Sequence, residues 1–559
     1  MKNFYELFFS LLSSFKYLFI LKNEKNSLAQ YLKIGLAVIF SVLYLPHAFI
    51  LIQDINLISA FEVDPGSIIA SINDLFNMPM YNMLNGYHSK FYGWTYFSIN
   101  FLLLTPLKIL LYLFGIKSQT PILFAIKIIY FSIGLLMTLA FYEVLNKLSR
   151  NRFLIINFLF SFLFVASSVH YVFYFIHPES TGALFIFLGI STLLLFIKES
   201  KLLLYYTGVI FLVMASLAKQ TFFIAALPIF FCFLDVYRRS ININSSSFVT
   251  STHLFKLLKN TFYLSLFIFF IIHPYAFFKP IAFLSFQHSL ALSFSANGEV
   301  SYIDSIYSWI NFLKYNHLMY FSFWSLFFVI PFAFYKYKKT NHYEYFLTVM
   351  NGIAAIFIFL FVAYGNRLVF FDNYLFPCYL FLFFNIFVIS HFLIIKTRNY
   401  KFVFFNEFFH VAFISLFSYF IFTGMKATLT DSLTRLNYKN SIAFRSYDYI
   451  KSNIKNGDKI AHDHFVAVPD YMNNISCHFW RGCGTDFIEE FNPNYVIFNP
   501  NFSFNGKSIE TQRLEKYVKD HNMILAGKIS SLQFNIVDVG ISNNDNTVSI
   551  LIYKKRPIK

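Results

Sequence analysis

The feature that most limits the fold is a series of apolar stretches between residues 34 and 424, each about as long as a membrane-spanning helix. A soluble protein could not bury so much apolar surface, because 57% of the 559 residues are hydrophobic and only 13% are charged. The sequence therefore predicts a mainly α-helical polytopic membrane protein of about 11 transmembrane helices. We place the predicted spans at residues 34–52, 121–146, 153–176, 180–197, 202–217, 221–236, 260–278, 315–335, 343–364, 371–395 and 403–424.

The distribution of Lys and Arg sets the orientation of these spans. With the N-terminus inside, the inner loops hold most of the basic residues, as the positive-inside rule requires. Residues 96–115 are apolar enough to span, but a crossing there would place the basic clusters outside. We therefore assign this segment to a re-entrant or surface-lying element of the first outer loop, because Pro106, Lys108 and Gly115 make it a poor single span. The inner basic clusters include Lys147, Arg150 and Arg152; Arg238 and Arg239; and Lys336, Lys338 and Lys339.

Three regions follow from this organisation. Residues 1–33 form an N-terminal helix on the cytoplasmic face, residues 34–427 form the transmembrane domain, and residues 428–559 form a small extracytoplasmic α/β domain. The net charge of +17 reflects the topology and does not indicate a nucleic-acid partner. Within the last region we predict helices at 440–455 and 509–521 and strands at 459–461, 495–498, 533–537 and 548–552.

The four cysteines fall into two pairs. Cys232 and Cys378 lie in apolar spans and are interpreted as core residues. Cys477 and Cys483 lie in the polar C-terminal region, where they could form a disulfide if that region faces an oxidising compartment.

Two acids, Glu62 and Asp64, lie just after the first predicted span. Pro65 favours an extended backbone at Asp64, and side chains two residues apart in an extended segment share a face. Both carboxylates could then address one substrate or one divalent cation. The alternative is a solvated loop that carries two acids by chance, but charges beside a membrane are costly without a task.

A third acid, Glu179, follows His177 and Pro178 at the outer end of the third crossing. Pro and Glu also suit the first turn of a helix, so a structural role is compatible with a functional one. Isolated cations also lie on the outer face, where they are candidates for binding a phosphate group or, alternatively, snorkelling side chains. These cations are Lys90, Lys219 and Arg367.

Several familiar motifs are missing from the sequence. It has no phosphate-binding Gly-Lys-Ser/Thr loop, no Gly-x-Gly-x-x-Gly and no His-Glu-x-x-His, so a nucleotide-driven pump, a dinucleotide enzyme and a membrane zinc protease are unsupported. His462, Asp463 and His464 are interpreted as a solvated strand end, because the spacing suggests no third metal ligand.

The order of these features along the chain resembles the GT-C glycosyltransferases, in particular bacterial relatives of the protein O-mannosyltransferases and the aminoarabinose lipid A transferase. Glu62-Val63-Asp64 resembles the acidic motif of that family. The stretch from His88 to Trp94 resembles its Lys-Pro-Pro segment without the two prolines. The stretch from Asn366 to Pro377, which holds Arg367 and Asp372, is similar to its Arg/Tyr-Leu-x-Pro segment, and Glu179 falls where relatives carry a second acid.

The resemblance implies an inverting transfer of a sugar from a polyprenyl-phosphate donor to a hydroxyl of a lipid, glycan or protein on the extracytoplasmic face of the cell membrane. Asp64 would be the general base, assisted by Glu62 and Glu179. The donor phosphate would contact Lys219, Arg367 and Lys90, and His177, His88 and Asp372 would bind substrate. No cofactor is required, although a divalent cation (Mg or Mn) is possible. An O-antigen ligase or polymerase, a lipid-linked glycan transporter or flippase, and a non-catalytic scaffold are the alternatives.

Overall fold

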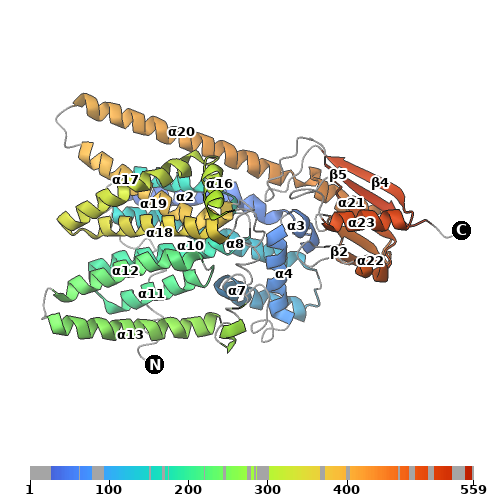
Figure 1. The fold of residues 1–559 in the computed structure, drawn as a ribbon, viewed down its shortest axis with the longest axis horizontal. Helices are drawn as coiled ribbons and strands as arrows, with labels where there is room; N and C mark the ends of the chain where they lie inside the picture. Colours follow the sequence, from blue (N-terminus) through green and yellow to red (C-terminus); the bar gives the residue numbers. More distant parts are fainter. Residues whose placement is uncertain are drawn as a thin grey trace.

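The computed structural model consists of a helical bundle with a small α/β domain at one end (Figure 1). We call the end of the bundle that carries this domain the domain end, and the other the opposite end. Residues 1–26, most of the predicted N-terminal helix, lie outside the described residues, as do residues 62, 88, 90 and 367; residues 27–33 are the start of helix α2 (Ser27–Tyr44). The structure describes residues 27–61, 63–77, 94–116, 118–149, 153–166, 170–173, 176–219, 221–242, 247–273, 278–282, 285, 301–365, 372–397, 403–463, 466–477, 485–500, 509–531 and 548–556.

Long apolar helices form the bundle and confirm the polytopic membrane class. Among the described residues, eight helices are long and apolar enough to cross a membrane. The most enclosed is α10 (Glu179–Glu199), whose apolar window is 89% buried. The other bundle helices are α2 (Ser27–Tyr44), α8 (Thr120–Leu148), α9 (Leu154–Val165), α11 (Leu202–Ser216), α12 (Thr221–Asn242), α13 (Ser247–Ile272), α17 (His317–Thr340), α18 (Tyr343–Gly365), α19 (Asp372–Thr397) and α20 (Val403–Leu436).

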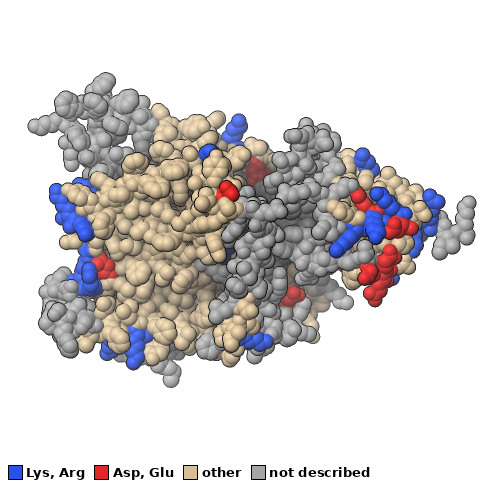
Figure 2. Space-filling view, viewed as in Figure 1, with Lys and Arg blue, Asp and Glu red and all other residues tan. Residues whose placement is uncertain are grey.

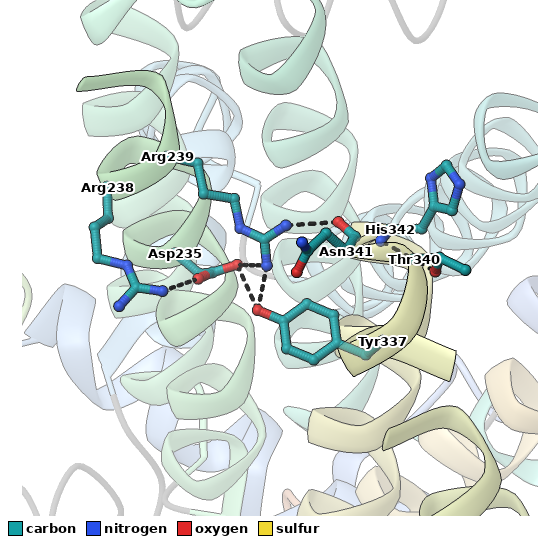
Figure 3. A network of polar contacts seen from close by, with 7 residues as sticks. All are labelled: Asp235, Arg238, Arg239, Tyr337, Thr340, Asn341 and His342. Atoms are coloured by element: carbon teal, nitrogen blue, oxygen red, sulfur yellow. Dashed lines mark hydrogen bonds and ion pairs between the residues drawn. The ribbon is translucent and has the colours of Figure 1, made fainter. Parts of the chain in front are cut away.

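The surface of the bundle has the character expected of a chain in a bilayer. On the face seen in Figure 2, the middle of the bundle shows a broad area with few charged residues, and Lys and Arg gather at the opposite end. At that end, Arg239 joins the last turns of α12 to the loop after α17 (Figure 3). Its guanidinium pairs with Asp235 at 2.7 Å, donates to the hydroxyl of Tyr337 and donates to the carbonyl of Asn341 at 2.5 Å. Two basic clusters that the sequence assigns to inner loops therefore lie at the same end of the bundle.

Helix α7 (Trp94–Leu113) is as apolar as a span but begins and ends at the domain end. Near its start, the amide of Thr95 donates to the carbonyl of Leu217 at the end of α11. Shortly after its end, Gln119 donates to Asp470 of the C-terminal domain at 2.7 Å. Figure 1 shows α7 nearly along its own axis, across the direction of the bundle. The segment is thus a continuous surface-lying helix, one of the two arrangements expected from the sequence, with Pro106 inside it.

The acidic segment after the first span is helical, so the extended backbone expected there is wrong. Helix α3 (Ile55–Phe61) is followed at once by α4 (Val63–Asn77), and Asp64 lies in the first turn of α4. Pro65 is compatible with this turn, because the first amides of a helix have no partner within the helix. Positions two apart on a helix do not share a face, so the argument for a shared face no longer holds.

In the described part of the C-terminal domain, five strands form one sheet between two layers of helices. The strand order is β2-β1-β3-β5-β4, with β1, β2 and β3 parallel and β5 antiparallel to both of its neighbours. Helix α21 (Ile442–Asn453) covers one face, and α22 (Thr485–Phe491) and α23 (Ile509–Asp520) cover the other. The strands are β1 (Ile460–Asp463), β2 (Asn474–Cys477), β3 (Tyr495–Phe498), β4 (Ile524–Ser531) and β5 (Val548–Lys554).

Successive side chains along a strand of this domain point alternately to the two helical layers and so form a core on each face of the sheet. Tyr495 and Ile497 of β3 face α21, whereas Val496 and Phe498 face α22 and α23, as the two-residue period of a strand requires. Cys477, at the end of β2, is disulfide-bonded, and Cys483, the partner that the sequence suggests, lies outside the described residues. Cys232 and Cys378 are free and buried, as expected.

Candidate functional site

A buried charge cluster at the domain end joins the starts of α10 and α12. Glu179, the first residue of α10, is 1% exposed. One of its carboxylate oxygens accepts a hydrogen bond from the ammonium group of Lys219, and the other is in contact with the Nδ1 of His177. Lys219 and His177 are also buried. The structure therefore brings together three of the residues that the sequence selected as candidates.

The protonation of the cluster follows from its burial. Burial, and then the neighbouring Lys219 ammonium, lower the pKa of His177 well below its usual value. Burial therefore favours the neutral imidazole, whose Nδ1 is in contact with the second oxygen of the Glu179 carboxylate. A buried carboxylate needs a counter-charge and hydrogen bonds, and Glu179 obtains both from Lys219.

The loop before α10 is held in place by hydroxyl groups next to Glu179. Ser180 donates to the carbonyl of Val172 at 2.8 Å, and the hydroxyl of Tyr130 on α8 donates to the same carbonyl at 2.5 Å. These bonds fix the first turn of α10 against α8. Tyr130 also packs edge-on against Tyr96 of α7, with ring centroids 6.4 Å apart, so the surface-lying helix reaches the same region.

Close packing of α10 against α12 makes the pairing of Glu179 with Lys219 possible. Gly182 lies one turn after Glu179, and the ring of Phe222 lies directly against it. A Cβ atom at position 182 would lie 2.4 Å from two ring carbons of Phe222. Only glycine permits this approach, which places the start of α12 beside the first turn of α10.

Two hydroxyl groups close to the cluster in the sequence are buried on α10 and α12. Among the described residues, the side-chain oxygens of Thr181 and Thr221 have no hydrogen-bond partner. Buried polar atoms are nearly always satisfied in folded proteins, so these two hydroxyls at the starts of α10 and α12 point to a polar ligand or water.

An apolar groove lies along the same helix, α12, whose start carries the cluster. The groove has a volume of about 660 Å³ and lies between α11, α12, α13 and α18. Its lining is almost entirely hydrophobic, and lining side chains such as Phe223 and Phe262 are exposed on the surface of the bundle. Leu217, at the end of α11, lines the groove and precedes Lys219 by two residues.

The remaining candidates lie outside the part of the chain whose side chains are described. This holds for Glu62, His88, Lys90 and Arg367, and for the side chains of Asp64 and Asp372, the first residue of α19. No group of three or more metal-binding side chains lies together among the described residues. His462 and Asp463 are buried in β1 rather than solvated as expected, and the Asp463 carboxylate accepts a hydrogen bond from the amide of Asn499 at 2.5 Å.

The sequence reasoning overlooked two buried cations at the domain end. Lys127 lies on α8, and its ammonium donates to the carbonyl of Ile50 at 2.5 Å. Arg435, near the end of α20, is 1% exposed and lies 3.7 Å from Asp431. Lys127 could have been selected from the sequence, because a single lysine near the start of an apolar span is uncommon unless it has a functional role.

No protein-family model matches this chain, and no curated protein matches it. The membrane class therefore rests on the apolar helices, and the site on its geometry.

Proposed function

We propose that this protein is an integral membrane glycosyltransferase that moves a sugar from a polyprenyl-phosphate donor to an acceptor hydroxyl. One observation carries the proposal: a buried cluster of Glu179, Lys219 and His177 lies at the start of α12, and an apolar groove of about 660 Å³ lies along the same helix. A lipid-linked sugar phosphate has these two parts, an apolar chain and an anionic head. The groove offers a place for the chain, and Lys219 offers a cation for the phosphate.

The reaction breaks the bond between the anomeric carbon and the phosphate oxygen. The acceptor hydroxyl oxygen forms the new bond to that carbon from the opposite face, and its proton passes to Asp64 as general base. The bonding electrons leave with the polyprenyl phosphate, which departs as an anion and needs cations rather than a proton. Lys219, with Arg367 and Lys90, would stabilise that charge.

Glu179 has a defined part in this proposal. It holds the Lys219 ammonium at the start of α12 in the absence of donor, and pairing with one carboxylate leaves an ammonium group the capacity to donate to a phosphate. The neutral imidazole of His177 supports the carboxylate from the other side. Loss of Glu179 would leave a buried cation without its counter-charge, which is strongly unfavourable.

The sidedness of the site is part of the proposal. The site and the C-terminal domain lie at the same end of the bundle, and the disulfide of Cys477 suits an oxidising compartment. Cations gather at the opposite end, as the positive-inside rule expects of the cytoplasmic face. An extracytoplasmic active site in the cell membrane is consistent with all three.

The test is transfer of a radiolabelled sugar from a defined polyprenyl phosphate by the full-length protein in lipid nanodiscs. We expect Asp64→Asn to lower turnover by about 100-fold or more, because it removes the base. Asp74→Asn is the matched control, since Asp74 is exposed on the same helix. Lys219→Met should lower turnover similarly, whereas Lys201→Met, at an exposed ion pair, should not. Equal turnover of wild type and Asp64→Asn would refute the proposed base.

A lipid-linked glycan transporter is the second candidate, favoured by one observation. Glu143 on α8 is buried within the bundle, 3.1 Å from Lys33 on α2 and 3.9 Å from Lys147. Buried ionised residues in spans are typical of transport pathways. Movement of a fluorescent polyprenyl-phosphate sugar across sealed proteoliposomes without an acceptor would support this candidate over transfer.

A further inference from the structure

Asp54 links the first outer loop to the C-terminal domain. The residue is 6% exposed and lies directly before α3. Its Oδ1 accepts a hydrogen bond from the amide of Asn56 at 2.8 Å, and its carbonyl accepts one from the amide of Ile58 at 3.3 Å. Asp54 therefore caps the start of α3 in the manner typical of an N-cap aspartate.

The other carboxylate oxygen of Asp54 binds the C-terminal domain. Oδ2 accepts hydrogen bonds from the hydroxyl of Tyr447 on α21 and from the amide of Asp470, both at 3.0 Å. Both donors are about 400 positions away in the chain, since the separations are 393 and 416 residues. One buried carboxylate thus joins the cap of a loop helix to two parts of the domain.

Neighbouring side chains reinforce the same junction. Asn56 donates to the carbonyl of Val468 at 2.9 Å, and Gln53 donates to the hydroxyl of Tyr438 at 3.3 Å. Gln119, just before α8, donates to the carboxylate of Asp470 at 2.7 Å. The loop and the first bundle helix after it are therefore both attached to the segment between β1 and β2.

Apolar packing continues the contact. Leu57 and Ile58 of α3 are fully buried in the core of the bundle, and Ala443, Tyr447 and Ala467 of the C-terminal domain belong to the same core. Burial and the Asp54 carboxylate raise the pKa of Tyr447, so its hydroxyl stays protonated and remains a donor. Polar and apolar contacts together leave little freedom for α3 relative to the domain.

We propose that the C-terminal domain is a positioning module for helices α3 and α4, and that Asp54 is the positioning residue through which it acts. Helix α3 has seven residues, and α4 follows it after one residue and carries Asp64 in its first turn. A shift of α3 relative to the domain is thus passed to the backbone of Asp64. The catalytic consequence rests on the proposed function, but the mechanical link does not.

The test is hydrogen exchange of the full-length protein in nanodiscs, read by mass spectrometry over residues 55–77. Asp54→Asn should raise exchange in α3 and α4 by about tenfold, because hydrogen bonds to a buried carboxylate are lost. Tyr447→Phe, a change within the domain itself, should raise exchange in the same helices. Exchange in the double variant should be only slightly faster than in either single variant, because both substitutions remove the same interaction. Tyr471→Phe is the control, since that side chain is 56% exposed.

Two outcomes would overturn the proposal: unchanged exchange in α4 for Asp54→Asn, or fully additive effects of the two variants. Exchange in β3 and β5 should stay at the wild-type level, which separates loss of positioning from general unfolding. In the transfer assay, Asp54→Asn should lower kcat while KM changes little. If neither variant nor wild type transfers sugar, the exchange result still decides the inference, because it does not depend on the reaction.

Discussion

The contact between Gly182 and Phe222 gives the sharpest test of how this site is built. Gly182→Ala adds one methyl group to the first turns of α10. The new carbon would lie 2.4 Å from Cδ2 and Cε2 of Phe222 and 2.9 Å from its Cγ, whereas carbon atoms in van der Waals contact are about 3.5–4.0 Å apart. The ring is fully buried, so it cannot swing into solvent.

The magnitude follows from this overlap of more than an ångström. Relief requires α12 to move away from α10 by about 1 Å, or the ring to leave its preferred rotamer. Overpacking of this kind costs about 1–3 kcal/mol. The same displacement weakens the bond between Glu179 and Lys219, because Lys219 lies just before α12. We therefore expect lower stability together with a larger fractional loss of transfer activity.

The assay is thermal unfolding in nanodiscs combined with the transfer assay. Gly35→Ala on α2 is the matched control, since its added carbon would lie 3.9 Å from Phe158, an ordinary contact. Adding Phe222→Leu should restore part of the stability of Gly182→Ala by making room for the methyl group. If Gly182→Ala melts with the wild type and with Gly35→Ala, the close approach does not govern the site.

Three further predictions concern other parts of the chain. Asp235→Asn should lower the free energy of unfolding by about 1–2 kcal/mol in chemical denaturation, because Arg239 loses its carboxylate partner at the opposite end; unchanged stability would mean that this ion pair does not stabilise the fold. Cys477→Ser should destabilise the C-terminal domain by about 2–4 kcal/mol, and reductant should lower the melting temperature of the wild type but not of this variant. Lys127→Met should raise the melting temperature while lowering transfer activity, because a buried cation that donates to a neutral carbonyl is costly for folding; a variant that loses stability instead would show that Lys127 is structural.

Local patterns predicted the regular parts of the C-terminal domain. The continuous apolar run at Tyr495–Phe498 is β3 with the expected limits, and the helices at 442–453 and 509–520 lie within the predicted ranges. The sequence analysis missed β2, whose four residues are mixed in polarity, and β4, where an irregularity between Leu525 and Gly527 interrupts the alternation. The strand expected at 533–537 lies outside the described residues.

The candidate site was only partly predictable, for a physical reason. Glu179 and Lys219 stand out in the sequence as single charges at the ends of apolar spans. Their pairing depends on Gly182, which is unremarkable in an apolar helix until its neighbour is known. Nothing in the sequence indicates that Asp54 contacts the C-terminal domain, because both of its partners there are distant in the chain. Single residues could be selected from the sequence, but long-range contacts decide which of them act together.

The position of α7 has a consequence for how the protein is made. As it leaves the ribosome, this helix is as hydrophobic as the segments that insert into the membrane. The bond from Thr95 to Met214, which ties its start to α11, spans 119 residues and cannot form until α11 has been synthesised. For that interval the nascent chain must keep α7 from crossing the bilayer without its final anchor. Deletions between α7 and α11 should therefore yield molecules in which α7 has crossed the bilayer and every later segment is inverted.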